Sequence, residues 1–486
     1  MRLAPALRRQ FSRPWAGTIA IAAAITVPAL PALTSRYGFS DDYSFLGYEQ
    51  SARDLLDQLA RNDRPLLGVV YAAGRPLVGT IDALVWARVF GLAGVFVLAL
   101  GLRAAARTAG FSARFALTLA IAVGLLPSVQ LYAAWASCAP YGWVSAASIL
   151  ASQRLVRGAA TLSLATRTRA VALLVVGGLT YQPAAGFFIV GLVLALLSPQ
   201  LRRDPRALIA EHARVVAIAA PIVLGWVIFA RIALGKGERT PLAQHPSRKA
   251  SWFFTEVLDN ATNPFDITPS HIVEAVVLVS IVAVIVMTGR RLRGRHSGLT
   301  VVALVAAVPI IYTPNLIVEE TWAAYRTLAA LSALVLVFII VALREVSHVI
   351  VAAVPGRSMR RRLDGACSAA VAASLVAVAL LVATTFHRDL VQPQTRELAA
   401  FRAAMRATYG EAPARIAIRQ LAEPPAPPAR YDEFRVPSLA KEWVPVGLAR
   451  AVLRADGRDP DALRLVRLAP GEPAPAGATV IEIDTR

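Results

Sequence analysis

The chain has 486 residues, of which 56% are hydrophobic and only 17% are charged, and its mean hydropathy is +0.55. Soluble globular domains carry roughly 25% charged residues, so this composition excludes a water-soluble, a disordered or a collagen-like chain of this size. The net charge of +20 does not indicate nucleic-acid binding, because the basic residues lie between apolar blocks. These blocks are about 20 residues long, the length that spans a bilayer core. We therefore expect a polytopic membrane protein.

Eleven apolar segments are predicted as transmembrane helices. They cover residues 15–34, 77–102, 113–131, 141–155, 170–181, 184–199, 214–234, 270–289, 299–313, 324–343 and 366–386. Tyr181-Gln182-Pro183 interrupts the pair 170–181 and 184–199, for which one kinked span of 30 residues is the alternative. Two short helices preserve the charge alternation of the loops that follow, so we expect two.

The loops predict the orientation of the chain. Six alternate segments carry 24 Lys or Arg, whereas the four intervening segments carry 8, together with 12 acidic residues. Because cytoplasmic loops are enriched in Lys and Arg, we expect a cytoplasmic N-terminus. An odd number of spans then places the tail outside. The tail is polar, and short strand-like runs at 415–418 and 480–483 accompany helical periodicity in it.

These observations predict an all-α transmembrane domain over residues 1–390 and a small extracytoplasmic α/β domain over residues 391–486. Two adjacent carboxylates, Asp41 and Asp42, follow the first span in the outer loop 35–76. Carboxylates at a membrane boundary are costly to bury, so they either remain solvated or have a function. The pair fits a general base, with or without a divalent metal, or a polar stop after a span.

Two arginines stand at the predicted entrances of spans. Arg75 lies in Gly74-Arg75-Pro76-Leu77, and Arg326 follows Glu319 and Glu320 at the tenth span. A guanidinium can hold a phosphate through two parallel hydrogen bonds. Alternatively, Arg75 is an interfacial anchor, and the segment from Glu319 to Arg326 forms a local ion pair that seals the helix end.

The order and sidedness of these short motifs resemble the GT-C superfamily of membrane glycosyltransferases, and within it the type II O-antigen glucosyltransferase (Gtr-type) family. The matching residues are Asp41-Asp42-Tyr43, Gly74-Arg75-Pro76-Leu77, Tyr181-Gln182, and Glu320 followed by Tyr325-Arg326. The tail segment Tyr431-Asp-Glu-Phe-Arg435-Val-Pro-Ser438 resembles the extracytoplasmic tails of actinobacterial relatives. No role is assigned to that segment from the sequence.

The resemblance implies transfer of a hexose from a polyprenyl-phosphate sugar to a glycan or glycolipid acceptor of the cell envelope. The reaction would occur at the outer face of a bacterial cytoplasmic membrane and invert the anomeric centre. Asp41 or Asp42 would be the general base, and Arg75 or Arg326 would steady the departing lipid phosphate. The residues implied for binding the sugar are Tyr181, Gln182, Glu319 and Glu320. A divalent cation such as Mg or Mn at Asp41 and Asp42 is compatible with this chemistry but not demanded.

Two other functions remain open from the sequence. A flippase or transporter for a lipid-linked sugar predicts charged groups near mid-membrane and a path between both faces. An envelope polysaccharide polymerase would use a lipid-linked oligosaccharide as its donor. A scaffold whose outer tail recruits partners is a third alternative, in which substitution of Asp41 and Asp42 is harmless.

Overall fold

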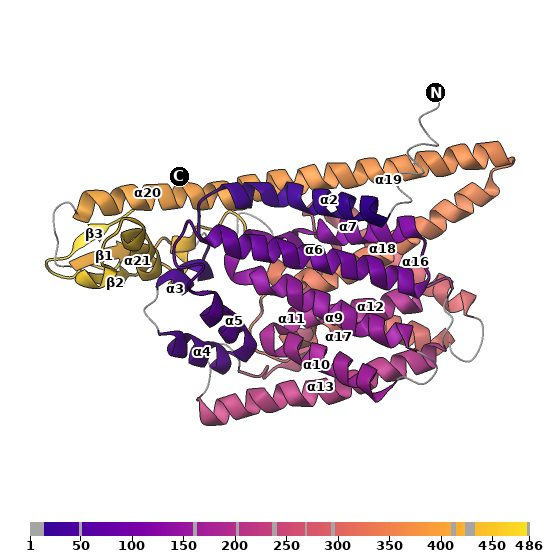
Figure 1. Ribbon diagram of the computed structural model, residues 1–486, viewed down its shortest axis with the longest axis horizontal. Coiled ribbons are helices and arrows are strands. Elements are labelled where there is room, and N and C mark those ends of the chain that lie inside the picture. Colours follow the sequence, from indigo (N-terminus) through magenta and orange to yellow (C-terminus); the bar gives the residue numbers. More distant parts are fainter. Residues whose placement is uncertain are drawn as a thin grey trace.

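The computed structural model describes residues 14–47, 51–158, 163–200, 204–235, 241–267, 270–292, 297–409, 415–422 and 433–483. A bundle of long helices forms most of the molecule, and a small α/β region lies at one end of it (Figure 1). The short helices α3 (Asp41–Gly47), α4 (Ala52–Arg61) and α5 (Pro65–Gly74) lie at that same end. The motifs around Asp41 and the tail therefore share one end of the bundle.

Within the described residues, seven helices are long and apolar enough to cross a membrane. They are α2 (Pro14–Thr34), α6 (Leu84–Ala109), α13 (Pro205–Ala233), α16 (Ser270–Arg291), α17 (Ser297–Leu316), α18 (Tyr325–Ala353), and the continuous helix Arg357–Tyr409. The last combines α19 (Arg357–Phe386), the π-helical turn η3 (His387–Val391) and α20 (Gln392–Tyr409). An eighth span arises if α7 (Ala113–Gly124) and α8 (Pro127–Ala134), which meet at a bend of 59°, count together.

The expected number of eleven spans is therefore higher than the number that meets these criteria. The three remaining predicted segments correspond to α9 (Ala139–Arg157), α10 (Leu164–Thr180), and the pair α11 (Gln182–Ala185) and α12 (Phe187–Leu196). These helices are too short or too weakly apolar to qualify alone, although α12 is buried along almost its whole length. The break predicted at Tyr181 is present between α10 and α11.

The second predicted span begins at the wrong place. It was expected over 77–102, but α6 begins at Leu84, because residues 75–83 form turns after α5 ends at Gly74. Thr80 accepts a hydrogen bond from the backbone N–H of Ala83 there. An exposed ion pair, Arg36 Nε to Asp82 Oδ1 at 3.6 Å, lies beside these turns. The charged and turn-forming residues of 75–83 thus place the start of the helix at Leu84.

The buried arginine Arg88 fixes the chain just before the Asp41 loop. Its guanidinium donates to the carbonyl oxygens of Ala32 at 3.1 Å and Ser35 at 3.2 Å, and also to that of Tyr37. The same group lies 3.7 Å from the centre of the Tyr37 ring. The last carbonyls of a helix lack intrahelical partners, so Arg88 satisfies the end of α2 and sets the exit direction of the chain.

The tail contains a parallel three-stranded sheet in the order β2-β1-β3. Its strands are β1 (Arg415–Arg419), β2 (Arg464–Leu468) and β3 (Thr479–Ile481). Helix α21 (Pro445–Ala455) and α20 bury the apolar side chains of the sheet, which form a separate core with Tyr43 of α3. The small α/β region is confirmed, and so are the helices predicted from its periodicity. Strand β2 was not anticipated.

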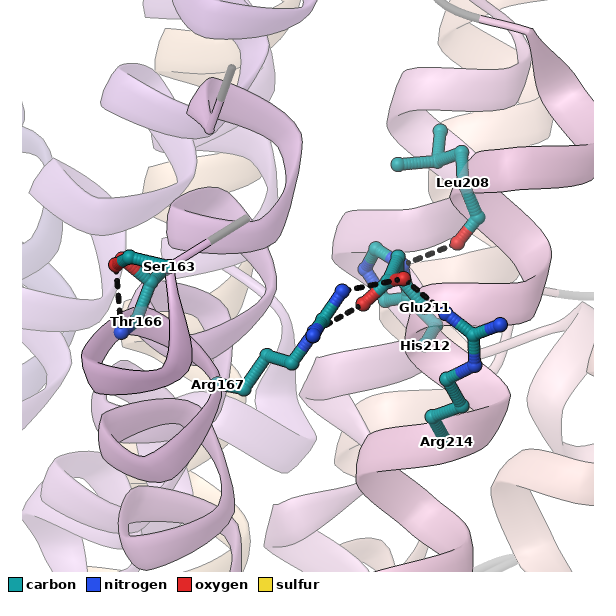
Figure 2. A network of polar contacts seen from close by, with 7 residues as sticks. All are labelled: Ser163, Thr166, Arg167, Leu208, Glu211, His212 and Arg214. Carbon is teal, nitrogen blue, oxygen red and sulfur yellow. Dashed lines mark hydrogen bonds and ion pairs between the residues drawn. The ribbon is translucent and has the colours of Figure 1, made fainter. Parts of the chain in front are cut away.

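A polar network joins α10 to α13 (Figure 2). Arg167 donates through Nε and Nη2 to both carboxylate oxygens of Glu211, at 2.8 and 3.0 Å, and Arg214 donates to Glu211 at 2.5 Å. Tyr181 follows the other end of α10, roughly 20 Å along the helix axis from Arg167 at 1.5 Å per residue. The network therefore braces the bundle far from the Asp41 loop.

Candidate active site

The structure brings together two motifs that lie far apart in the sequence. Asp41 is the first residue of α3 and Arg326 is the second residue of α18. Arg326 Nη1 lies 3.3 Å from Asp41 Oδ2, and the side chains are 14% and 34% exposed respectively. Arg326 therefore pairs with Asp41, and not with Glu319 as in the ion-pair alternative from the sequence.

The neighbouring carboxylate Asp42 serves a different purpose. Its Oδ1 accepts the backbone N–H of Ser137 at 2.8 Å, and its Oδ2 accepts that of Phe39 at 3.0 Å. The residue is only 1% exposed. Burial raises the pKa of Asp42 from 3.8 to about 6, against the lowering effects of Arg88 and of the two backbone donors. Asp42 thus anchors the loop to η1 (Ala136–Cys138) and leaves Asp41 as the accessible carboxylate.

Two indole rings flank the guanidinium of Arg326. The centre of the Trp135 ring lies 4.6 Å from Arg326 Cζ, and that of the Trp322 ring lies 4.9 Å from it. Trp135 in turn meets Phe39 edge to face, with ring centres 4.6 Å apart. An arginine held against aromatic faces keeps its charge while losing conformational freedom. The pair of rings thus directs Arg326 toward Asp41.

Tyr181 lies in a second aromatic group near this ion pair. Its ring stacks almost parallel on that of Tyr141, with centres 3.7 Å apart, and Arg64 lies 5.1 Å from the Tyr181 centre. Arg64 and Arg326 interact electrostatically, so the two guanidinium groups belong to one positive region. Gln182 donates to the carbonyl of Asp63 at 2.7 Å, which joins α11 to the turn between α4 and α5.

The structure places Glu319 and Glu320 against a different loop. Glu319 Oε2 accepts the backbone N–H of Gln244 at 2.9 Å, and its own N–H donates to Pro241 at 2.8 Å. The carbonyl of Glu320 accepts a hydrogen bond from the ammonium of Lys249. A cavity of about 90 Å³ opens beside them and is lined by His245, Arg248, Lys249, Glu319 and Thr321. These contacts secure residues 241–245 and the helix α14 (Pro246–Trp252) that follows them. A sugar-binding role for either glutamate stays a prediction.

Arg75 lies at the C-terminal cap of α5, half-buried, with its backbone N–H donating to Tyr71 at 3.0 Å. Tyr71 donates from its hydroxyl to the carbonyl of Ser137, the residue that binds Asp42. Helix α5 is therefore tied to the same η1 segment as the Asp42 anchor. The predicted phosphate contact of Arg75 remains a prediction.

The described side chains around Asp41 do not by themselves form a divalent-cation site. Hard cations such as Mg²⁺ take about six oxygen ligands, usually with carboxylates free to coordinate. Both oxygens of Asp42 accept backbone N–H groups, and Asp41 pairs with an arginine. In the described part of the chain, no group of three or more His, Cys, Asp or Glu side chains could hold a metal ion. No step of the proposed reaction therefore uses a metal.

Sequence reasoning missed Arg64, Trp135 and Tyr141, which complete the surroundings of the predicted residues. Trp135 and Tyr141 lie in the charge-free segment 127–142, where aromatic residues at a membrane boundary are ordinary. Arg64 is one of four basic residues in 35–70. Only the fold, which places Trp135 against Arg326 and both Tyr141 and Arg64 against Tyr181, distinguishes these three from their neighbours.

The chain is a multi-pass integral membrane protein with a small α/β region at one end. No family model matches it, and no curated protein is similar to it, so the resemblance to the Gtr-type family is not confirmed. Among solved structures it is similar to the archaeal oligosaccharyltransferase AglB from Archaeoglobus fulgidus. A complex with an inhibitory peptide and a dolichol-phosphate shares 12% identity at a TM-score of 0.43, over 84% of this chain and 62% of that one.

A second structure of the Archaeoglobus fulgidus oligosaccharyltransferase was solved with zinc and sulfate. It shares 11% identity at a TM-score of 0.42, over 82% of this chain and 60% of that one. The apo form shares 13% identity at a TM-score of 0.41, over 92% and 64% of the two chains. The chain thus spans less than two thirds of the length of these enzymes.

Proposed function

We propose that the chain is an integral membrane glycosyltransferase. It transfers a hexose from a polyprenyl-phosphate sugar to a glycan or glycolipid acceptor at the outer face of the cytoplasmic membrane. The observation that carries the proposal is the ion pair of Asp41 and Arg326, flanked by two indole rings. A carboxylate and a guanidinium are the two groups that such a displacement requires, one for the acceptor proton and one for the departing phosphate.

In the proposed reaction Asp41 removes the proton from an acceptor hydroxyl. The acceptor oxygen attacks the anomeric carbon while the bond from that carbon to the phosphate oxygen breaks. The leaving oxygen takes the bonding electron pair and gains negative charge, which Arg326 stabilises. One displacement inverts the anomeric centre. The proton on Asp41 then passes to solvent, for which its partial exposure is suited.

Binding of the donor also releases Asp41 from its ion pair with Arg326. Arg326 prefers a phosphate, with which it can form two parallel hydrogen bonds, over a single contact with Asp41 at 3.3 Å. A bound lipid phosphate therefore competes with Asp41 for the guanidinium. Once the pairing weakens, the Asp41 carboxylate is free to accept the proton of an acceptor hydroxyl.

The depth of the site suits a lipid-linked donor. Arg326 lies at the beginning of α18, a candidate span. Asp41 lies seven residues after Thr34, where α2 ends. A polyprenyl chain lies in the hydrocarbon, so its phosphate and sugar lie at the boundary where these helices end. Tyr181 and its partner Tyr141 present an aromatic group next to this position.

The test is a transfer assay with purified protein in proteoliposomes, using a panel of polyprenyl-phosphate sugars and envelope glycolipid acceptors. We expect Asp41→Asn to lower transfer by roughly 100- to 10,000-fold, the range that general-base catalysis contributes. Asp82→Asn is the matched control, because it removes an exposed outer carboxylate whose partner is Arg36. That variant should transfer sugar at the wild-type rate.

Transfer that is indifferent to Asp41→Asn would remove the base from this mechanism. Absence of transfer with every donor, together with movement of a labelled lipid-linked sugar between leaflets, would replace the enzyme with a flippase. Transfer only from a lipid-linked oligosaccharide would instead identify a polymerase.

A further inference from the structure

The tail segment 433–447 contacts Arg326 and the residues that flank Asp41, although it lies more than 100 residues beyond either member of the ion pair. Glu433 is 4% exposed, and its two carboxylate oxygens accept the backbone N–H groups of Tyr325 at 3.2 Å and Arg326 at 3.4 Å. Residues 431 and 432, which belong to the same sequence motif, lie outside the described residues. Glu433 is therefore attached to the first turn of α18.

This contact replaces a local helix cap. The first four N–H groups of a helix lack intrahelical acceptors, and a nearby carboxylate also favours the positive end of the helix dipole. Ala324 occupies the N-cap of α18, and an alanine side chain carries no acceptor atom. Phe434 secures the arrangement through edge-to-face contacts with Tyr325 at 5.1 Å and Phe386 at 5.2 Å.

On the other side of the ion pair, Ser438 holds the residue before Asp41. Its hydroxyl oxygen accepts the backbone N–H of Ser40 at 2.9 Å, and the hydroxyl donates to Gln394 at 2.6 Å. Glu397 accepts the N–H groups of Ser438 at 2.8 Å and Leu439 at 2.7 Å. Ser40 has a φ of 44°, a left-handed conformation that is costly for serine and requires support from its surroundings.

Helix α21 completes the contact between the tail and the loop. Gly447 lies so close to α3 that an added Cβ would stand 2.5 Å from the carbonyl oxygen of Tyr43. Only glycine allows this approach without a shift of one backbone. The tail therefore meets the Asp41 loop at Ser40 and at Tyr43, on both sides of the carboxylate.

We propose that segment 433–447 is a positioning element of the active site, in which Glu433 sets the place of Arg326 and Ser438 sets the place of Asp41. Both members of the ion pair are tied to one short stretch of chain, so a displacement of the tail changes their separation. The catalytic part of this proposal rests on the proposed glycosyltransferase function. The structural part, that the tail holds α18 and the Asp41 loop, does not.

The test compares Glu433→Gln and Ser438→Ala with the wild-type chain in nanodiscs, by hydrogen–deuterium exchange and by sugar transfer. Glutamine can accept one of the two N–H groups, but its NH₂ group faces the other donor. We expect faster exchange at Tyr325 and Arg326 in Glu433→Gln, and at Ser40 in Ser438→Ala. We expect kcat to fall by on the order of 100-fold, the effect of a displacement of about 1 Å, with a smaller change in KM.

The matched control is Glu482→Gln, which removes the ion pair of an exposed glutamate with Arg419 from the same tail but lies outside segment 433–447. It should change neither exchange in these two segments nor kcat. Ser438→Ala approaches the ion pair from the opposite side, so it tests the proposal even if Glu433→Gln fails to fold.

Unchanged exchange at Tyr325, Arg326 and Ser40 in both variants overturns the proposal. Faster exchange with an unchanged kcat overturns its catalytic part. Faster exchange in a chain that transfers no sugar, wild type included, upholds the positioning role while the proposed glycosyltransferase function fails.

Discussion

Replacement of Gly447 by alanine isolates the contact between the tail and the Asp41 loop. The added Cβ would stand 2.5 Å from Tyr43 O and 2.9 Å from its carbonyl carbon, whereas ordinary contacts begin at 3.4 Å. Helix α21 must therefore move by about 1 Å, and overpacking of this kind costs about 1–3 kcal/mol. Alanine recovers about 0.5–1 kcal/mol through its helix propensity. We expect the folded, docked tail to lose about 1 kcal/mol of stability.

The consequence should be larger for transfer than for stability. A misplacement of about 1 Å near reacting groups can cost on the order of 100-fold in rate. Limited proteolysis of the tail measures docking, and the proteoliposome assay measures transfer. Gly225→Ala in α13 is the control, because its Cβ would meet open space among the described residues. A Gly447→Ala variant with wild-type protection and wild-type transfer would refute the reasoning.

Two further outcomes follow from buried charges near the loop. The pKa of Asp42 is raised from 3.8 to about 6 in the folded protein, so the folded state holds the proton of this carboxyl more tightly than the unfolded state does. The free energy of unfolding should therefore fall by about 3 kcal/mol as the pH rises from about 4 to above 6. Asp42→Asn should lose this slope in denaturation experiments at pH 4 to 7, and an unchanged slope would contradict it. Arg88→Met leaves three carbonyl oxygens without their donor, so we expect a loss of at least about 3 kcal/mol in thermal denaturation; a variant as stable as wild type would disprove this role.

Hydropathy and charge alternation predicted the helical membrane fold correctly, but they overestimated the number of full spans. The reason lies in α9 and α12, which other helices largely cover, and in α10, which is only 17 residues long. A helix that packs against protein can be shorter or less apolar than one that meets lipid along its length, and composition does not reveal which neighbour it has. The tail was recognised as α/β because short strand-like runs such as 415–418 accompany helical periodicity in it, and Ile416, Ala417 and Ile418 of β1 are all buried.

The candidate site was predictable only in part. Asp41 and Arg326 were named because charges at span boundaries are unusual, yet no spacing rule could pair residues 285 positions apart. A local ion pair of Arg326 with Glu319, seven residues earlier, was one of two alternatives from the sequence. Glu319 precedes the start of α18 at Tyr325, so the helical spacing does not apply to it.

The adjacent carboxylates Asp41 and Asp42 show why a raised pKa alone does not identify a base. Asp42 has the pKa that a base working near neutrality requires. However, both of its oxygens already accept backbone N–H groups, and acceptor hydroxyls cannot reach a side chain that is 1% exposed. Its pKa reflects the burial that makes it a good anchor. Asp41 has the more accessible carboxylate, so under the proposed function access favours Asp41 as the base, while Asp42 anchors the loop.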